Sequence, residues 1–171
     1  SVGHASTIVA GVGGQVATLA DAIHLAQDGD TIELLSGEYR GDVAVLWQKR
    51  LTIRGMGRRP VLIADGQHAE GKAILVVRDG EVAIENLEFR GARVPDGNGA
   101  GIRFERGRLR VRTCAFFDNE NGLLTGNSED AELIIEDSEF AQAPRVDGKL
   151  HHLLYVGRIA SLSVSGSRFH Q

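Results

Sequence analysis

Nine polar side chains in the second half of the chain are of types that bind or process charged substrates. They are Arg103, Asp118, Asn119, Asn121, Asn127, Lys149, His151, His152 and Tyr155. Arg103 and Lys149 could bind a carboxylate, Arg103 in a bidentate manner. His152 or His151 could act as a general base and Tyr155 as a proton donor, the pair of roles that β-elimination from a uronic acid needs. We therefore treat the two histidines and the tyrosine as candidate catalytic residues, and the other six as candidate substrate-binding residues.

Several of these residues also have a purely structural interpretation. Tyr155 aligns in the sequence with Phe104, which is expected to point into the core, so its hydroxyl could simply reach a local partner. Adjacent histidines at the entrance of a strand are more often solvated than catalytic. The asparagines from Asn119 to Asn127 are also common turn residues. The sequence leaves both interpretations open.

An eight-residue pattern repeats along the chain and must position these side chains. It runs Val82–Phe89, Leu109–Phe116, Leu133–Phe140 and Leu162–Phe169, with a weaker copy starting at Leu51. Each copy reads as two short strands of alternating apolar residues that meet at a bend. The spacing of the copies is typical of a stacked solenoid. We expect equivalent residues of successive coils to lie above one another as parallel strands.

Equivalent positions form columns that support this register. One column holds four phenylalanines, Phe89, Phe116, Phe140 and Phe169, and the bend column holds Gly55, Asn86, Thr113, Asp137 and Gly166. Two outward columns alternate in sign: Arg54, Glu85, Arg112, Glu136 and Arg50, Glu81, Arg108, Glu132. Opposite charges that face each other across parallel strands stabilise the pair, so Arg108 and Arg112 in the run of arginines from 106 to 112 are interpreted as cross-strand partners of these glutamates. Arg110 has no obvious partner.

The N-terminal segment has a different character. Residues 7 to 10 predict a short strand, and Thr18 is a good N-cap for an amphipathic helix that should end near Asp28. Such a helix would cover the open apolar end of the first coil. The chain is therefore interpreted as one domain over residues 1–171, with cap and first strands to about residue 35 and stacked coils from 36 to 171.

Four motifs between about residues 16 and 55 resemble a known family. They are Ala22-Ile23 through Ala26, Gly29-Asp30-Thr31-Ile32, Gly37-Glu38-Tyr39 and Leu51-Thr52-Ile53-Arg54-Gly55. They closely resemble the N-terminal signature of right-handed parallel β-helix proteins of the pectate-lyase-like superfamily, which includes pectate lyases, pectin methylesterases, polygalacturonases and many bacterial proteins. The repeats extend the resemblance to the end of the chain. It implies an all-β, three-sheet solenoid with a short capping helix, and a bacterial member of this group.

The resemblance also implies three strands per coil and a place for any binding site. The first strand of each coil would be residues 74–76, 102–104, 123–125 and 153–155, with Leu75, Arg103, Leu124 and Leu154 pointing outward. Calcium-dependent lyases of this fold carry aspartates there, so neither calcium nor another cofactor is expected. The polygalacturonase Asp-Asp and Gly-His-Gly motifs and the second methylesterase aspartate are also missing. Long polar loops on this side predict a site on the outer face of the first sheet.

Composition limits the partners. The net charge of −4 argues against nucleic-acid binding, and no segment is apolar enough to span a membrane. Cys114 is the single cysteine, so no intramolecular disulfide can form, and its repeat position predicts a buried thiol. Ser1 fits either a processed or an artificial N-terminus, so the compartment stays open, with a secreted or periplasmic location favoured.

Three functional hypotheses remain. The leading one is a carbohydrate-directed protein that binds or processes an acidic polysaccharide on the first-sheet face. The second is a non-catalytic structural or surface-interaction solenoid. The third is the N-terminal part of a larger β-helix enzyme. Because no cap follows Phe169, we expect either a C-terminally truncated fragment or a homodimer, formed end to end or through the first-sheet face.

Overall fold

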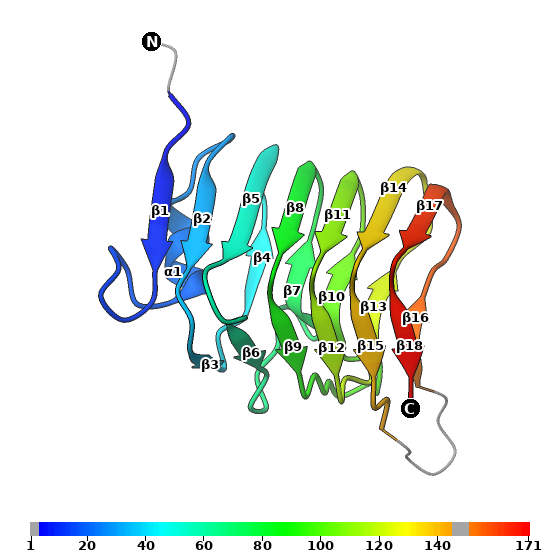
Figure 1. Cartoon of the computed structure of the whole chain (residues 1–171). Helices are drawn as coiled ribbons and strands as arrows, with labels where there is room; N and C mark the ends of the chain where they lie inside the picture. The colour runs from blue at the N-terminus through cyan, green and yellow to red at the C-terminus, as the bar shows by residue number, and fades with distance from the viewer. Residues whose placement is uncertain (1–3, 145–150) are drawn as a thin grey trace.

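The computed structural model describes residues 4–144 and 151–171 as three parallel β-sheets wound into one solenoid (Figure 1). The first sheet contains β4 (Ala44–Leu46), β7 (Ala73–Val77), β10 (Ala100–Phe104), β13 (Asn121–Thr125) and β16 (His152–Tyr155). The second contains β1 (Thr7–Ala10), β2 (Thr31–Leu34), β5 (Arg50–Gly55), β8 (Glu81–Glu85), β11 (Arg108–Arg112), β14 (Ser128–Glu136) and β17 (Ile159–Ser165). The third contains β3 (Glu38–Arg40), β6 (Val61–Ile63), β9 (Glu88–Arg90), β12 (Ala115–Phe117), β15 (Glu139–Ala141) and β18 (Arg168–His170).

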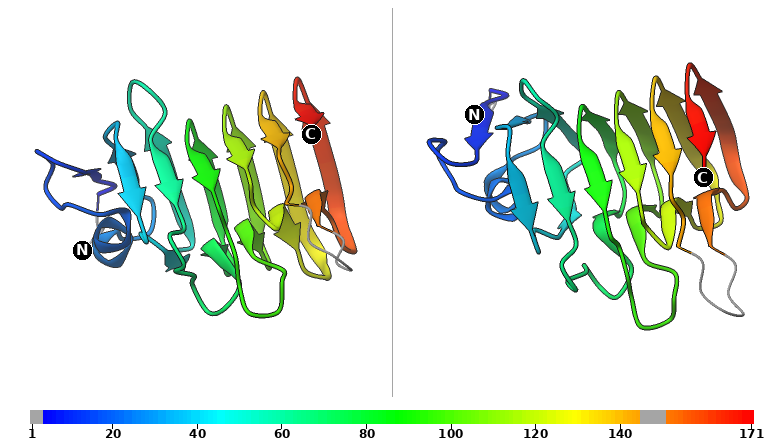
Figure 2. Two further views of the ribbon diagram at one scale, coloured as in Figure 1. Left: turned by 90° about the horizontal axis from the view of Figure 1, so that it is seen from below. Right: turned by 60° about the horizontal axis from the view of Figure 1, so that its bottom comes forward.

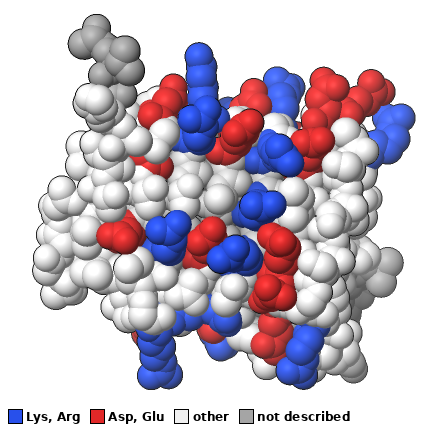
Figure 3. All heavy atoms as spheres, turned by 45° about the horizontal axis from the view of Figure 1, so that its top comes forward, with Lys and Arg blue, Asp and Glu red and all other residues white. Residues whose placement is uncertain are grey.

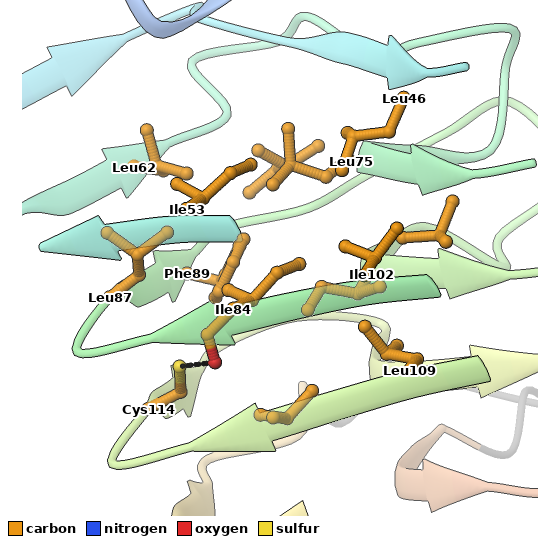
Figure 4. Close-up of a cluster of buried hydrophobic side chains, with 14 of the residues drawn as sticks. Leu46, Ile53, Leu62, Leu75, Ile84, Leu87, Phe89, Ile102, Leu109 and Cys114 are labelled. Carbon is orange, nitrogen blue, oxygen red and sulfur yellow. Dashed lines mark hydrogen bonds between the residues drawn. The ribbon is translucent and has the colours of Figure 1, made fainter. Parts of the chain in front are cut away.

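The predicted register of the second and third sheets is confirmed. Residues of the repeated pattern pair with their equivalents in the next coil, as Leu109 does with Val82 and with Leu133. The four phenylalanine rings stack with centroids 5.0, 4.4 and 4.8 Å apart along the column. Aliphatic side chains from all three sheets fill the remaining interior, where the Cys114 thiol approaches the carbonyl oxygen of Ile84 (Figure 4).

The bends between second- and third-sheet strands use left-handed backbone conformations. Asn86, Thr113, Asp137 and Gly166 have φ angles between 50° and 59°. Asparagine, aspartate and glycine tolerate this region best, which explains most of the column. Gly55 does not share the positive φ. Instead, a Cβ at position 55 would lie 1.9 Å from the carbonyl oxygen of Asn86, so glycine is needed there for close packing.

The alternating charges on the second sheet form ion pairs between coils (Figure 3). Arg54 pairs with Glu85 at 3.1 Å and Arg108 with Glu132 at 3.4 Å. Arg110, which had no predicted partner, reaches diagonally to Glu136 at 3.2 Å. These pairs are exposed and contribute little individually, but they oppose slippage of the register.

The N-terminal end is closed by α1 (Leu19–Leu25), as Figure 2 shows. Thr18 is the N-cap, as predicted, and accepts a hydrogen bond from the amide of Asp21. The helix ends earlier than the expected Asp28, because Ala26 has an extended backbone (φ −65°, ψ 138°). The Gln48 side chain donates hydrogen bonds to the carbonyl oxygens of Ile23 and Ala26 at this end. The Asp42 carboxylate accepts hydrogen bonds from the amides of Leu19 and Ala20, 2.7 and 2.9 Å away. In the described part of the chain, no helix is long and apolar enough to cross a membrane.

The first sheet has the predicted strands, but part of its predicted orientation is wrong. Arg103 pairs with Val76 and Leu124, and Leu124 pairs with Tyr155. The outward column is therefore Val45, Val76, Arg103, Leu124 and Tyr155. Leu75 and Leu154 lie in the inward column, and the predicted alignment of Tyr155 with Phe104 is wrong. Strands that are apolar on both faces carry no alternating pattern from which their orientation could be derived.

A loop covers the apolar part of this outer face. Ala69, in the loop before β7, packs with Ala73, Val76, Ala100 and Leu124 in a small cluster separate from the main core. The same loop is fixed by ion pairs that join Glu70 and Lys72 to Arg78 and Glu105. The outer face of the first sheet is thus covered at β7, and its polar residues are concentrated at β10, β13 and β16.

Candidate functional site

An open pocket of about 480 Å³ lies on the outer face of the first sheet. Its walls come from β10, β13 and β16, the loop before β10 and the turn after β13. The lining residues are Asp96, Asn98, Arg103, Asn121, Leu124, Thr125, Gly126, Asn127, His152, Tyr155 and Gly157. The size is in the range of small-molecule sites, and the lining is mostly polar.

The structure brings five of the predicted residues to this pocket. Arg103, Asn121, Asn127, His152 and Tyr155 all line it, although they are up to 52 positions apart (155 minus 103) in the sequence. Parallel stacking explains this, because β10, β13 and β16 are neighbours in the first sheet. Asn127 also has a structural role between coils, since its Oδ1 accepts a hydrogen bond from the amide of Arg158.

The other four candidates do not line the pocket. Asp118 forms an ion pair with Arg93 at 2.8 Å. Asn119 is 2% exposed and holds two chain segments together, accepting a hydrogen bond from the amide of Ala92 and donating one to the carbonyl oxygen of Phe89. Both ring nitrogens of His151 are buried without a hydrogen-bond partner among the described residues. Lys149 lies outside the described residues.

Arg103 is the cationic centre of the pocket. In the outward column it lies between Val76 and Leu124, so both of its neighbours there are apolar. Within residues 4–144 and 151–171 it has no ion pair, and its Nε atom is buried without a hydrogen-bond partner. With respect to the described residues, its guanidinium therefore remains available to an anionic ligand.

His152 and Tyr155 form the wall contributed by the last strand of the first sheet. Their ring centroids are 5.3 Å apart and the ring planes are tilted by 47°. Tyr155 is 48% exposed, because it points outward from the sheet and not into the core. An exposed aromatic face beside polar groups can pack against the apolar face of a sugar ring.

The loop of residues 91–99 is one of the long polar loops expected on this side, but its contributions to the pocket, Asp96 and Asn98, were not among the predicted residues. The loop is held by Glu120, which is 7% exposed and whose Oε1 accepts hydrogen bonds from the amides of Val94 and Gly99 at 2.8 and 3.0 Å. The polar run Asn119-Glu120-Asn121, which leads into β13, is the sequence feature that could have pointed to this loop. Asn119 and Glu120 accept hydrogen bonds from amides of the loop, and Asn121 lines the pocket.

Three parallel sheets, each with one strand per coil, decide the architecture. The chain is a right-handed parallel β-helix. No protein-family model matches the sequence, and no curated protein matches it. A solved structure of a pectin methylesterase variant in complex with a hexasaccharide aligns with all of this chain and 67% of its own length, at a TM-score of 0.47 and 15% identity. The three parallel sheets themselves confirm the fold that the N-terminal motifs predicted.

The β-helix offers this pocket a limited set of chemical groups. Among the described residues, Asp96 is the single carboxylate that lines the pocket, and no group of three His, Cys, Asp or Glu could hold a metal ion. Hydrolysis by a close pair of carboxylates therefore has no basis in the described lining. Proton transfer by His152 and Tyr155 beside a carboxylate bound to Arg103 is the chemistry for which the groups are present.

Proposed function

We propose that the β-helix binds an acidic saccharide containing uronic acid units in the pocket on the outer face of its first sheet. The observation that carries this proposal is the convergence of Arg103, His152 and Tyr155 on one open pocket. Arg103 binds the uronate carboxylate through paired charge-assisted hydrogen bonds. Tyr155 packs against the sugar ring, and Asn121 donates hydrogen bonds to ring hydroxyls.

Because the chain has a net charge of −4, an acidic saccharide would be attracted by charges within the pocket and not by the protein as a whole. A polyanion is repelled by the molecule as a whole, so we expect its affinity to depend on the Arg103 guanidinium, the one Lys or Arg side chain among the described lining residues. Binding should therefore be specific for acidic over neutral saccharides.

A lyase reaction is the catalytic form of this proposal. His152 would remove the proton adjacent to the uronate carboxylate, and Tyr155 would protonate the departing glycosidic oxygen. The second candidate function is a non-catalytic binding module, which is favoured because the described lining residues include only one carboxylate. Both share the same binding site and differ in whether product forms.

The test is a calorimetric titration with oligogalacturonate and with a neutral galactose oligomer of equal length. The acidic oligomer should bind, and Arg103→Gln should weaken it at least about tenfold, the effect of losing roughly 1.4 kcal/mol of interaction. Arg106→Gln, at an exposed arginine that does not line the pocket, is the matched control and should bind normally. Equal binding of both oligomers, or of neither, would contradict the proposal.

Ultraviolet absorbance of the unsaturated product separates the two forms. Product that disappears in His152→Gln while binding persists would establish a lyase. Binding without product would establish the module.

A further inference from the structure

A second hollow lies on the outer face of the second sheet and shares no lining residue with the first-sheet pocket. It measures about 280 Å³. Its floor belongs to the central outward column of this sheet, which contains Thr52, Ala83, Arg110 and Ile134. Ala83 ends at a methyl group, so the column is shortest there. Rows of charged side chains flank a strip of uncharged surface on this face (Figure 3).

Three arginines border the hollow. Arg50 and Arg108 come two residues before Thr52 and Arg110 on their strands, and alternate residues of a strand share one face. Arg110 is the third arginine. Glu81, which pairs with both Arg50 and Arg108 in register, is the one carboxylate among the described lining residues. The lining therefore carries an excess of positive charge, although the chain as a whole is negative.

The ion pairs of these arginines leave donors free for a ligand. Arg108 and Arg110 approach glutamates of the next coil through Nε, at 3.4 and 3.2 Å, and those glutamates do not line the hollow. Arg50 lies 3.9 Å from Glu81, the longest of the arginine–glutamate pairs between second-sheet coils in the described chain. A guanidinium has more N–H donors than one such contact uses. Glu81 is exposed, so its carboxylate can turn to the solvent when Arg50 binds a ligand.

We propose that this hollow is a binding site for a phosphate group. Phosphate oxygens accept paired, charge-assisted hydrogen bonds from guanidinium groups. These oxygens point in several directions, so one phosphate can contact arginines of different coils at once, whereas the two oxygens of a carboxylate lie in one plane. The charge of a phosphate monoester at neutral pH, nearly two negative charges, matches the positive excess of the lining. The Thr52 hydroxyl can donate a further hydrogen bond.

Titration of the chain with sodium phosphate, followed through the nuclear magnetic resonance shifts of its backbone amides, tests the site. Sodium chloride at equal ionic strength is the reference for general screening. The amides of Thr52, Ala83 and Arg110 should shift and reach saturation with phosphate and not with chloride. Shifts that never saturate, that appear equally with chloride, or that concentrate around Arg103 in the first-sheet pocket would overturn the proposal.

The variant Ala83→Ile fills the floor of the hollow without changing its charge. The same outward column already carries isoleucine at position 134, so the sheet accommodates this side chain. Phosphate affinity should fall at least about tenfold, and Arg110→Gln should cause a comparable loss. Unchanged affinity in Ala83→Ile would overturn the proposal.

Arg112→Gln provides the matched control. Arg112 is exposed on the other side of the central column and does not line the hollow, so this variant should bind phosphate normally. A loss as large as that of Arg110→Gln would mean that only the overall charge of the face matters, and would refute a defined site. If a variant fails to fold, as its amide spectrum would show, the titration of the unmodified chain still decides the question.

A hexose phosphate in the same titration distinguishes two sources of the group. Tighter binding than that of inorganic phosphate would assign the hollow to a phosphorylated sugar, and equal or weaker binding would assign it to the free ion. The unphosphorylated hexose should leave the three amides unshifted. Saturable shifts with that uncharged sugar would contradict recognition through the phosphate.

Discussion

His152 and Tyr155 lie side by side on the outer face of the last first-sheet strand, with ring centroids 5.3 Å apart. If the sugar packs on the tyrosine ring, Tyr155→Ala should weaken oligogalacturonate binding about tenfold, while Tyr155→Phe, which keeps the ring, stays within about threefold. Trp47→Ala removes another exposed aromatic residue outside the pocket and is the matched control in the same titration. Equal losses in the alanine and phenylalanine variants would assign the interaction to the hydroxyl.

Glu120 should control the loop that forms one wall of the pocket. Glu120→Ala leaves the amides of Val94 and Gly99 without their acceptor and should lower the free energy of unfolding by about 2 kcal/mol or more. Glu120→Gln keeps an oxygen acceptor and should lose less. Urea denaturation measures both, and hydrogen exchange at residues 94 and 99 reports the loop directly. Glu129→Ala, at an exposed glutamate, should have no comparable effect, and unchanged exchange in Glu120→Ala would refute this role.

The phenylalanine column should contribute stability according to burial. Phe116 is 1% exposed and stacks on two neighbours, so Phe116→Ala should cost about 3–5 kcal/mol of unfolding free energy. Phe169 stacks on one neighbour and is 44% exposed, so Phe169→Ala should lower the unfolding free energy by less than half as much. Urea denaturation of the two variants gives the comparison. Equal losses would mean that the rings do not form one buried stack.

The Asp42 carboxylate that caps α1 should make stability depend on pH. Its pKa is raised above the ordinary value of 3.8, because desolvation by burial outweighs the hydrogen bonds from Ala20 and Leu19 that lower it. The unfolded chain therefore loses this proton at lower pH than the folded chain does. The contribution of Asp42 to stability is fully present below pH 3.8 and is lost as the pH rises through the folded pKa.

The difference in unfolding free energy between the unmodified chain and Asp42→Asn isolates this effect. The unmodified chain should lose stability relative to the variant as the pH rises above 3.8, and the difference should become constant above the folded pKa. Asp130→Asn, at an exposed aspartate, provides the control. A difference that changes in the opposite direction would show that the two helix amides dominate the pKa of Asp42.

Cys114 should be chemically silent in the folded chain. Burial raises the pKa of its thiol to about 12, so almost no thiolate exists at pH 8. A thiol reagent should react only after denaturation. Cys114→Ser should fold, because Ser138 and Ser167 occupy equivalent positions and their hydroxyls donate to carbonyl oxygens two residues before them, as the thiol does. Rapid reaction of the native thiol would indicate that the coils open locally.

The sequence by itself determined the repeat, the second and third sheets, the phenylalanine stack and the signs of the paired charges. Alternating strands have one apolar face, so a shift of one residue would place leucines in water and arginines in the core. Thr18 likewise fixed the start of α1, because an N-cap acts within one turn.

Only the tertiary structure decided the orientation of the first sheet and therefore the site. Ile74 to Val77 and Leu153 to Leu154 are apolar at every position, so their sequence does not show which side chains face outward. The outward position of Tyr155, the structural role of Asn119 and the contribution of Asp96 depend on contacts between coils 21 to 31 residues apart, such as Asn121 with His152 and Ala100 with Asn121. Loop positions set by such long-range contacts leave no local pattern in the sequence, whereas alternation within a strand does.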